Sequence, residues 1–368
     1  MNRIIVSIIS EQTIPNYLFI KEMFQDGDSL LFISSRKFQE RITWIQQTLK
    51  IADDLVQSII FPEGGEERWN DMDAELTKVL SPECDYMVNL TGGTKYMTLL
   101  VLSVFEKYRS RFFYIPFPQN TLLEPLKNDS ISLTYRLRVD EYLSNYHVTF
   151  TEKKLTESEE YCDYLFERFL NGSLNYKLID DLRSYRNVKK KAIFDIENCI
   201  PTERYPRIED LNDFLTNIQF PIEEKGFLKK NEFEYLTGGW FEEFVYYKIQ
   251  RYVNPQDIKL GVLIKRTENR NQNDLDVVFT SGNKLFVIEC KTGIAGVKMF
   301  NETVYKATAI KEAVLGLSAN TFIVSLVPKN EDLEKTARNM GIHYKCREDI
   351  TGDRMMEFIN QIKNIAKD

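Results

Sequence analysis

Four charged residues near the C-terminus, Asp274, Asp276, Glu289 and Lys291, have types and spacing suited to phosphate chemistry. They lie in the run NDLDVVFTSGNKLFVIECK, which reads as two strands joined by a Gly-Asn turn at 282–283. Counting back from that turn places Asp276 opposite Glu289 and Asp274 opposite Lys291. Because side chains alternate along a strand, all four share one face, and the other face is apolar.

Two opposed carboxylates repel each other unless a cation or a proton lies between them. A hard divalent ion with oxygen ligands suits Asp276 and Glu289, and Lys291 beside it can hold a phosphate or position a water. The alternative interpretation is an edge hairpin whose acids are ordinary solvated surface residues. Asp274 is either a further ligand or, as we favour, a salt partner of Lys291.

The composition of the chain limits the classes of protein to consider. Its 368 residues suffice for two or three domains, and the net charge of −7 means that nucleic acid can bind only through local basic patches. Five dispersed cysteines without a CxxC pair predict reduced, structural thiols. Because the chain has only two histidines, a His-based catalytic triad or a His-rich zinc site is nearly excluded. With no signal peptide and no membrane span, we expect a cytoplasmic protein.

The first part of the chain, 1–145, alternates short apolar runs with helical patterns. Expected strands at 4–9, 30–34, 55–61, 85–90 and 111–116 alternate with helices, which predicts a parallel, doubly wound, Rossmann-like α/β sheet. Runs near 122–126 and 131–137 could close that sheet with a hairpin.

Two polar loops of this part are expected at one edge of the sheet. The strand ending YMVNL is followed by TGGTK at 91–95 and a long helix, so backbone N–H groups and the helix dipole point at one place. Two glycines let an anion approach closely, Thr94 can cap the helix, and Lys95 adds charge. The first strand ends in SEQT, at 10–13, on the same edge. The alternative is a tight turn in which the glycines only satisfy geometry.

A break is expected at about 141–154, followed by a polar, helical connector over 146–232. The connector carries a basic cluster, Arg183, Arg186 and Lys189 to Lys191, which we interpret as a solvated face in preference to a substrate path. The final part, 233–368, is expected to contain a helix from 240 to 252, three strands, a helix, a strand at 321–326 and a last helix. It is a second α/β domain.

These motifs resemble two known families. NLTGGTK and SEQTIPN are similar to the CARF sensor domain of CRISPR-associated proteins. GGWFEEFVYY, NDLDVVF and IECK are similar to the restriction-endonuclease-like PD-(D/E)xK fold. Together and in this order they resemble the cyclic-oligoadenylate-activated CARF nucleases of type III CRISPR defence, most weakly between about 150 and 230.

The resemblance implies roles for particular residues. In that family an Asp, and a Glu on the next strand, bind Mg²⁺ or Mn²⁺, and a Lys two residues later assists the attacking water; these correspond to Asp276, Glu289 and Lys291. A helical acid often joins them, and Glu242 fits, with Glu243 as the rival because adjacent helical residues point about 100° apart. The residue before the first acid is Leu275, where the family name has Pro.

The resemblance also implies a homodimer whose sensor domains bind a cyclic oligoadenylate, with cyclic tetra-adenylate the first candidate. Ligand would close the dimer and realign two nuclease sites. The implied ligand set is Ser10, Gln12, Thr13, Thr91, Gly92, Gly93, Thr94 and Lys95.

The expected reaction is hydrolysis of phosphodiester bonds in single-stranded DNA or RNA, or nicking of duplex DNA. Lys298, Lys306 and Lys311 could hold the backbone, and Trp240 and Tyr305 could stack on a base, although Trp240 is more simply a core residue. The rival hypotheses are a non-catalytic sensor that binds nucleic acid or a protein, and a sensor domain that degrades its own ligand.

Overall fold

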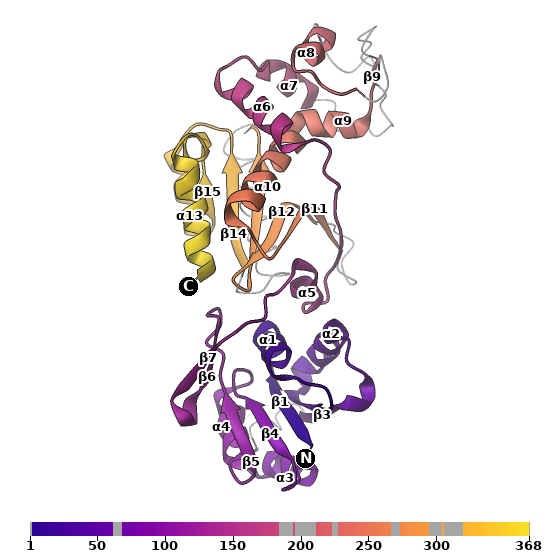
Figure 1. Ribbon diagram of the computed structural model, residues 1–368, viewed down its shortest axis with the longest axis vertical. Helices are drawn as coiled ribbons and strands as arrows, with labels where there is room; N and C mark the ends of the chain where they lie inside the picture. Colours follow the sequence, from indigo (N-terminus) through magenta and orange to yellow (C-terminus); the bar gives the residue numbers. More distant parts are fainter. Residues whose placement is uncertain are drawn as a thin grey trace.

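The computed structural model describes residues 2–61, 68–183, 194–195, 211–222, 227–265, 273–293, 304 and 319–367. In this part of the chain two α/β domains follow one another along the long axis of the molecule (Figure 1). The N-terminal domain forms one end, the C-terminal sheet lies in the middle, and helices α6 to α9 form the other end. The predicted fold class, a doubly wound domain, a helical region and a second α/β domain, is confirmed.

The N-terminal domain contains a five-stranded parallel sheet in the order β3-β2-β1-β4-β5. This is the doubly wound arrangement, and its strand order reverses between β1 and β4. The strands are β1 (Arg3–Ile9), β2 (Ser29–Ser35), β3 (Val56–Phe61), β4 (Asp85–Asn89) and β5 (Arg109–Phe113). Their helices are α1 (Ile14–Met23), α2 (Gln39–Leu49), α3 (Trp69–Val79) and α4 (Lys95–Phe105).

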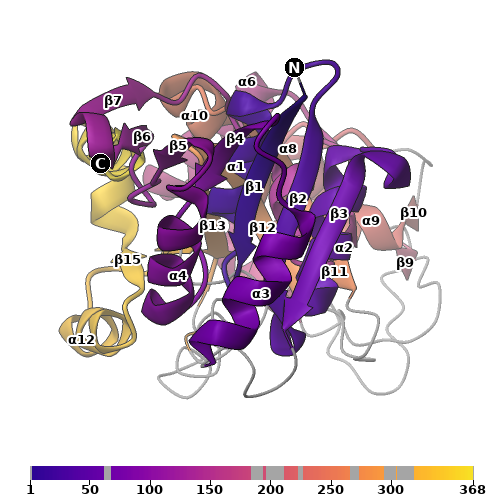
Figure 2. The ribbon, with the colours of Figure 1, turned by 90° about the horizontal axis from the view of Figure 1, so that it is seen from below.

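Helices cover both faces of this sheet, so its central strands are apolar along nearly their whole length. On one face Ile5 of β1 packs with residues of α1 and α2. On the other face Val6 and Ile8 pack with residues of α3 and α4. The view from the N-terminal end shows the strands between these helices (Figure 2).

The hairpin β6 (Thr121–Glu124) and β7 (Asp129–Ser132) forms as predicted, but it does not close the parallel sheet. It is a separate two-stranded sheet, joined to the end of β5 by a bridge between Tyr114 and Leu123. The buried carboxylate of Glu124 accepts two hydrogen bonds from Arg111 of β5, at 3.0 and 2.7 Å. This paired contact attaches the hairpin beside the sheet rather than in it.

The C-terminal domain contains a six-stranded mixed sheet in the order β15-β14-β13-β12-β11-β8. Its strands are β8 (Thr149–Thr151), β11 (Asp257–Lys265), β12 (Asn273–Ser281), β13 (Lys284–Lys291), β14 (Ala319–Ser325) and β15 (His343–Lys345). The main helices are α10 (Trp240–Val253), α12 (Glu331–Asn339) and α13 (Arg354–Lys367). The helix predicted between the third and fourth strands falls almost entirely outside the described residues.

The stretch 141–154, where a break was expected between the domains, contains two short elements, α5 (Val139–Ser144) and β8. β8 pairs with β11 and so forms the edge of the C-terminal sheet. The sequence signal is weak because both elements are short. The helices that follow are α6 (Glu159–Leu170), α7 (Tyr176–Arg183), α8 (Leu211–Asn217) and α9 (Lys230–Glu234), and α6 to α8 share one hydrophobic core with α10. Short elements are η1 (Arg36–Phe38), η2 (Asp53–Leu55), η4 (Pro125–Lys127), β9 (Phe194–Asp195), β10 (Phe227–Leu228), the π turn η5 (Tyr235–Gly239) and η6 (Arg347–Ile350).

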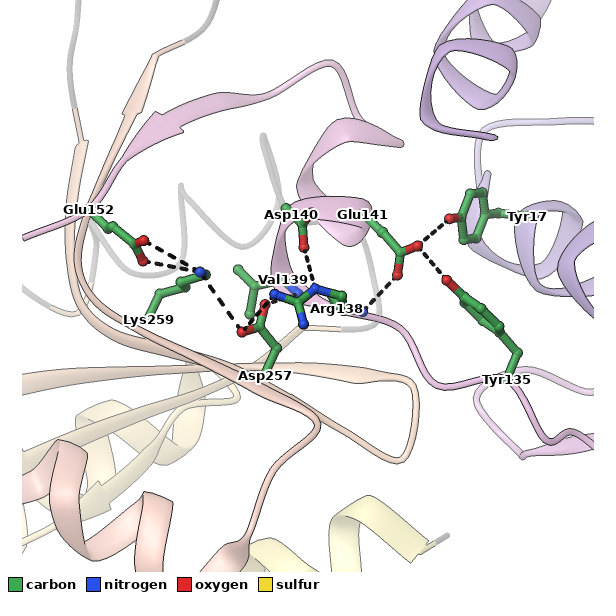
Figure 3. Close-up of polar contacts among 9 residues, drawn as sticks. All are labelled: Tyr17, Tyr135, Arg138, Val139, Asp140, Glu141, Glu152, Asp257 and Lys259. Atoms are coloured by element: carbon green, nitrogen blue, oxygen red, sulfur yellow. Dashed lines mark hydrogen bonds and ion pairs between the residues drawn. The ribbon is translucent and has the colours of Figure 1, made fainter. Parts of the chain in front are cut away.

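Helix α5 lies between the two domains and is held from both sides (Figure 3). Toward the N-terminal domain, Glu141 accepts hydrogen bonds from the hydroxyl of Tyr17, at 2.7 Å, and from that of Tyr135. Toward the C-terminal domain, Asp257 of β11 accepts a hydrogen bond from the Val139 N–H at 3.0 Å. The contact of Asp257 puts a carboxylate beside the backbone N–H groups at the start of α5, where the helix dipole favours it.

The turn between β12 and β13 is a second joint between the domains. Asn283 is fully buried there; its side-chain oxygen accepts a hydrogen bond from the Leu137 N–H at 2.8 Å, and its amide donates to Asn120 at 2.7 Å. Asn120 in turn donates to the Gly282 carbonyl at 2.9 Å. The tip of the C-terminal hairpin is therefore inserted into the N-terminal domain.

Asn283 has a φ of 61°, so glycine can replace it without backbone strain. We expect Asn283→Gly to lower the free energy of unfolding by about 2 kcal/mol, because the Leu137 N–H loses its buried acceptor. The matched control is Asn128→Gly, since Asn128 has a φ of 53° in an exposed turn. Urea unfolding of both variants tests this, and equal stability of the two would contradict the role of the Asn283 amide.

Candidate functional site

The hairpin of β12 and β13 has the register counted from the sequence. Gly282 and Asn283 have φ values of 59° and 61°, as a type I′ turn requires, and Ser281 pairs with Lys284. The backbone ladder continues to Val277 and Ile288. The next pair is Asp276 and Glu289, which therefore lie opposite each other where the ladder ends.

Beyond that point the side chain of Asp276, instead of a backbone carbonyl, accepts the hydrogen bond from β13. Its Oδ2 accepts a hydrogen bond from the Cys290 N–H at 2.6 Å. Asp276 is 8% exposed and Glu289 is 3% exposed, so neither is an ordinary surface acid. The interpretation of this face as a solvated edge is wrong.

Lys291 joins these two carboxylates. Its Nζ lies 3.3 Å from Glu289 Oε2 and 3.9 Å from Asp276 Oδ2. Burial favours the neutral amine, but the two carboxylates outweigh it, so the pKa of Lys291 lies above its ordinary value. Lys291 is therefore a fixed cation between two acids.

The structure distinguishes the two glutamates of α10. Glu243 is 2% exposed and accepts hydrogen bonds from the N–H groups of Thr156, at 2.6 Å, and Glu157, at 3.0 Å. Burial raises the pKa of Glu243, and these backbone donors oppose the shift. Glu242 instead lies 3.5 Å from the Nζ of Lys153, in the cavity that holds Asp276. Glu243 anchors the linking segment through two backbone N–H groups, whereas Glu242 faces Lys153, and both glutamates line the cavity.

The expected salt pair of Asp274 with Lys291 is replaced by another. Asp274 Oδ2 lies 3.6 Å from the Nζ of Lys153, whereas Lys291 pairs with Asp276 and Glu289. The reason is that Lys153, which follows strand β8 on the far side of β11, reaches across to the carboxylates. The register of the β12–β13 hairpin could not show that a lysine following β8 reaches this face.

These groups line one cavity of about 770 Å³. Acids and cations line it together: Glu234, Glu242, Glu243, Asp274, Asp276 and Glu289 lie with Lys153, Lys154, Arg183 and Lys291. The carboxylates offer only oxygen ligands, which is the donor chemistry that Mg²⁺ and Mn²⁺ prefer. Among the residues that the structure describes, no three acidic, Cys or His side chains are gathered into one metal-binding group.

Other sequence predictions for this site have different outcomes. Trp240 is 1% exposed and packs in the core, as we favoured, so it does not stack on a substrate base. Lys298, Tyr305, Lys306 and Lys311 lie outside the described residues, as do Arg186 and Lys189 to Lys191 of the basic cluster. Arg183 from that cluster does line the cavity, where we had favoured a solvated face.

A second cavity, of about 520 Å³, lies at the ends of β1 and β4, where the strand order of the N-terminal sheet reverses. Ligands of doubly wound folds bind at this position. Six of the predicted ligand residues line it: Ser10, Gln12, Thr91, Gly92, Gly93 and Thr94. Two lie elsewhere. Thr13 is fully buried and donates a hydrogen bond to the Asn145 carbonyl at 2.9 Å, and Lys95 is exposed at the start of α4.

The loop before α4 is held in place by its own polar groups. The Thr91 hydroxyl donates to Asn89 at 2.6 Å and accepts a hydrogen bond from the Ile115 N–H at 2.8 Å. Thr94 caps the helix, as predicted, by accepting from the Met97 N–H at 3.2 Å. A Cβ atom on Gly92 would lie 1.8 Å from the Ile8 carbonyl oxygen, so only glycine fits there.

The cavity also contains residues that the sequence reasoning missed. Lys37 and Phe38 follow β2, and Tyr114, Ile115 and Phe117 follow β5. The signal that could have found them is the topology itself, because loops after neighbouring parallel strands meet at one edge. Lys37 supplies the cation that had been assigned to Lys95.

A doubly wound sensor-like domain with a ligand cavity at its switch point, joined to a restriction-endonuclease-like domain, defines the class of this protein. Residues 4–142 match the family model of the Card1 CARF domain, and residues 229–364 match that of the Card1-like endonuclease domain. The two models together cover about three quarters of the chain. The chain belongs to the CARF-domain nucleases that combine these two domains.

Solved structures show the same architecture over the full length. Protein VC1899 from Vibrio cholerae has a TM-score of 0.76 at 18% identity, covering 100% of this chain and 99% of its own. Can2 from Sulfobacillus thermosulfidooxidans, in complex with cyclic tetra-adenylate, has a TM-score of 0.75 at 20% identity, covering 97% and 99%. A type III CRISPR defence DNA nuclease activated by cyclic oligoadenylate has a TM-score of 0.58 at 15% identity, covering 95% of this chain and 48% of its own.

No curated protein sequence matches the chain. In the described ranges, no helix has the length and apolar character needed to cross a membrane.

Proposed function

We propose that this protein is a homodimeric, metal-dependent nuclease that a cyclic oligoadenylate switches on in type III CRISPR defence. The observation that carries the proposal is the buried pair Asp276 and Glu289, opposed across β12 and β13 and joined by Lys291. The match to the Card1-like endonuclease model supports it.

The chemistry of the nuclease site follows from these side chains. Asp276 and Glu289 would hold Mg²⁺ or Mn²⁺, and Glu242 would move toward them to complete the set, because the three carboxylates share one cavity without being gathered into a metal-binding group. The bound ion would polarise the scissile phosphate and lower the pKa of its water. Lys291, a cation beside both acids, would stabilise negative charge developing on the phosphate oxygens.

The N-terminal cavity is the proposed activator site. The start of α4 directs backbone N–H groups and the helix dipole toward the Gly92–Gly93 loop, which suits a phosphate, and Lys37 adds charge. Phe38, Tyr114 and Phe117 offer faces on which adenine can pack. The complex of Can2 with cyclic tetra-adenylate supports that ring as the activator.

A second copy of the chain is the proposed partner at this end of the molecule. Tyr96 and Leu99 of α4 are 38% and 58% exposed, and Tyr114 at the cavity is 40% exposed. Large apolar side chains in this position favour an interface. A ring bound between two such cavities would hold two chains together. Single-stranded DNA or RNA is the proposed substrate, with nicking of duplex DNA as the other outcome of a cleavage assay.

Calorimetric titration with cyclic tetra-adenylate tests the activator site without any cleavage. We expect one ring bound per two chains and a dimer by light scattering. Linear tetra-adenylate is the control, and equal binding of the linear and cyclic forms would overturn the ring specificity.

Alanine substitutions at Glu242 and Glu243 separate a site residue from a structural one. We expect Glu242→Ala to lower the cleavage rate by about 10²-fold with little change in stability, because it removes an oxygen ligand from the cavity. We expect Glu243→Ala to lower the free energy of unfolding by about 2 kcal/mol, because the Thr156 and Glu157 N–H groups lose their acceptor. Cleavage assays and urea unfolding of both variants measure this. Loss of cleavage in Glu243→Ala and loss of stability in Glu242→Ala would make Glu243 the site residue and Glu242 the structural one.

A further inference from the structure

Two cations of the nuclease cavity come from the part of the chain that neither family model covers. The CARF model ends at residue 142 and the endonuclease model starts at 229. Lys153, just after β8, and Arg183, the last residue of α7, both line the cavity with Asp276 and Glu289. The intervening segment therefore contributes directly to the nuclease site.

Contacts with β11 hold Lys153 in place. Its N–H donates to the Leu260 carbonyl at 3.0 Å, which extends the contact with β11 two residues beyond the end of β8. Its side chain crosses β11 over Gly261, where a Cβ atom would lie 2.4 Å from Lys153 Cδ. The absence of a side chain at 261 thus opens the path by which the Lys153 ammonium group reaches the cavity.

The ammonium group of Lys153 is paired with two of the acids that it reaches. Its Nζ lies 3.5 Å from Glu242 Oε2 and 3.6 Å from Asp274 Oδ2. The side chain is 50% exposed, and an ammonium group has three N–H donors. Lys153 can therefore hold a carboxylate and an incoming phosphate oxygen at the same time.

Arg183 contacts Thr292, the residue that follows Lys291 at the end of β13. Its Nη2 donates to the Thr292 hydroxyl at 2.6 Å, and its Nε donates to the Thr237 carbonyl at 3.3 Å. A Cβ atom on Gly293 would lie 2.6 Å from Arg183 Nη1, so a glycine again makes room for the cation. These contacts, together with the ion pair between its Nη1 and Asp180, fix the guanidinium group beside the catalytic strand, and its planar donors suit phosphate.

We propose that Lys153 and Arg183 bind backbone phosphates of the nucleic-acid substrate on either side of the bond that is cut. The inference rests on the proposed nuclease function and adds the substrate-binding residues to it. Six carboxylates line the cavity and the chain has a net charge of −7, so a polyanion needs cations at this place. Lys153 is paired with Glu242 and Asp274, and Arg183 contacts the end of β13, so the two cations mark different parts of the same cavity.

The test is the salt dependence of oligonucleotide binding by the full chain. All proteins carry Glu289→Gln to prevent cleavage, with Mg²⁺ and cyclic tetra-adenylate present, and the probe is fluorescent oligo(dT) of about 20 nucleotides. Lys153→Met and Arg183→Met are each expected to weaken binding several-fold. Each is also expected to reduce the slope of log affinity against log salt by about 0.7, the value for one phosphate contact on a single strand.

Two controls separate phosphate binding from a structural role. Lys177→Met removes an exposed cation from the same helix as Arg183 but outside the cavity, and is expected to leave the slope unchanged. Lys153→Arg keeps the charge and is expected to retain the wild-type slope. A variant that is merely destabilised loses active protein without a change in slope.

Unchanged affinity and slope in Lys153→Met and Arg183→Met would overturn the inference, as would a loss equal to that of Lys177→Met. Cleavage by the unsubstituted protein is measured separately. If it cleaves while both Met variants bind normally, the nuclease function holds and these two sites are wrong. If it cleaves nothing with any activator or metal, the nuclease function itself fails.

Discussion

Glu289→Gln is expected to abolish cleavage, with a loss of about 10³-fold or more in rate. The substitution keeps the shape of a side chain that is 3% exposed but removes its charge. The cavity then loses a proposed metal ligand, and Lys291 loses the carboxylate that lies 3.3 Å from its Nζ. Binding of cyclic tetra-adenylate is expected to be unchanged, because its proposed site lies in the other domain.

The measurement is the initial rate of cleavage at saturating activator and metal. Glu357→Gln is the matched control, because Glu357 is an exposed acid of α13 away from the cavity, and it is expected to cleave like the unsubstituted protein. Activator binding by calorimetry shows that Glu289→Gln remains folded. Retained cleavage by a folded Glu289→Gln protein would remove Glu289 from the catalytic site.

Gly92→Ala is expected to weaken activator binding by about 10²-fold or more. The new methyl group would lie 1.8 Å from the Ile8 carbonyl oxygen, which belongs to the central strand β1 and cannot move aside. The loop at 91–94 must shift instead, and with it the N–H groups that face the cavity. A loss of 10²-fold corresponds to about 2.7 kcal/mol of binding free energy.

Titration with cyclic tetra-adenylate measures this effect. Gly27→Ala is the comparison, because nothing lies within 4 Å of a Cβ there and only its φ of 91° opposes the change. It is expected to lower stability by about 1 kcal/mol and to leave activator binding unchanged. Gln12→Ala, which removes a cavity side chain without a clash, keeps the test valid if Gly92→Ala does not fold. Normal binding by both Gly92→Ala and Gln12→Ala would place the activator elsewhere.

The two proposed sites are connected by a short path through the structure. Phe117 lines the N-terminal cavity, and Asn120, three residues later, contacts the β12–β13 turn at Gly282 and Asn283. The strands leaving that turn carry Asp276 and Glu289. A shift of the loop after β5 on ligand binding would therefore reach the catalytic pair through a single hairpin, which gives an activator a physical means of changing the nuclease site.

Much of the fold could be predicted because it is encoded locally. Apolar runs and helical periodicity gave the doubly wound sheet, and the Gly-Asn turn gave the register that opposes Asp276 and Glu289. The short elements α5 and β8 were not predicted, because their sequence signal is weak. The hairpin β6–β7 was predicted, but it lies beside the parallel sheet, where Glu124 pairs with Arg111.

The sites were less predictable because they combine distant segments. Nothing near residue 153 or 183 indicates a catalytic cavity, since Lys153 arrives through the edge strand β8 and Arg183 through the core shared by α6 to α8 and α10. Helix periodicity alone could not choose between Glu242 and Glu243. The structure shows that their contacts differ, because Glu243 is buried and accepts hydrogen bonds from two backbone N–H groups, whereas Glu242 pairs with Lys153.

The measurement that tests the central claim most directly is cleavage of single-stranded DNA, single-stranded RNA and supercoiled plasmid, with cyclic tetra-adenylate and Mn²⁺ each present or absent. We expect cleavage only when both are present, and its pattern identifies the substrate. Cleavage that does not depend on the ring would contradict the activation. No cleavage of any substrate, despite tight binding of the ring, would contradict the nuclease function and favour a sensor without catalysis.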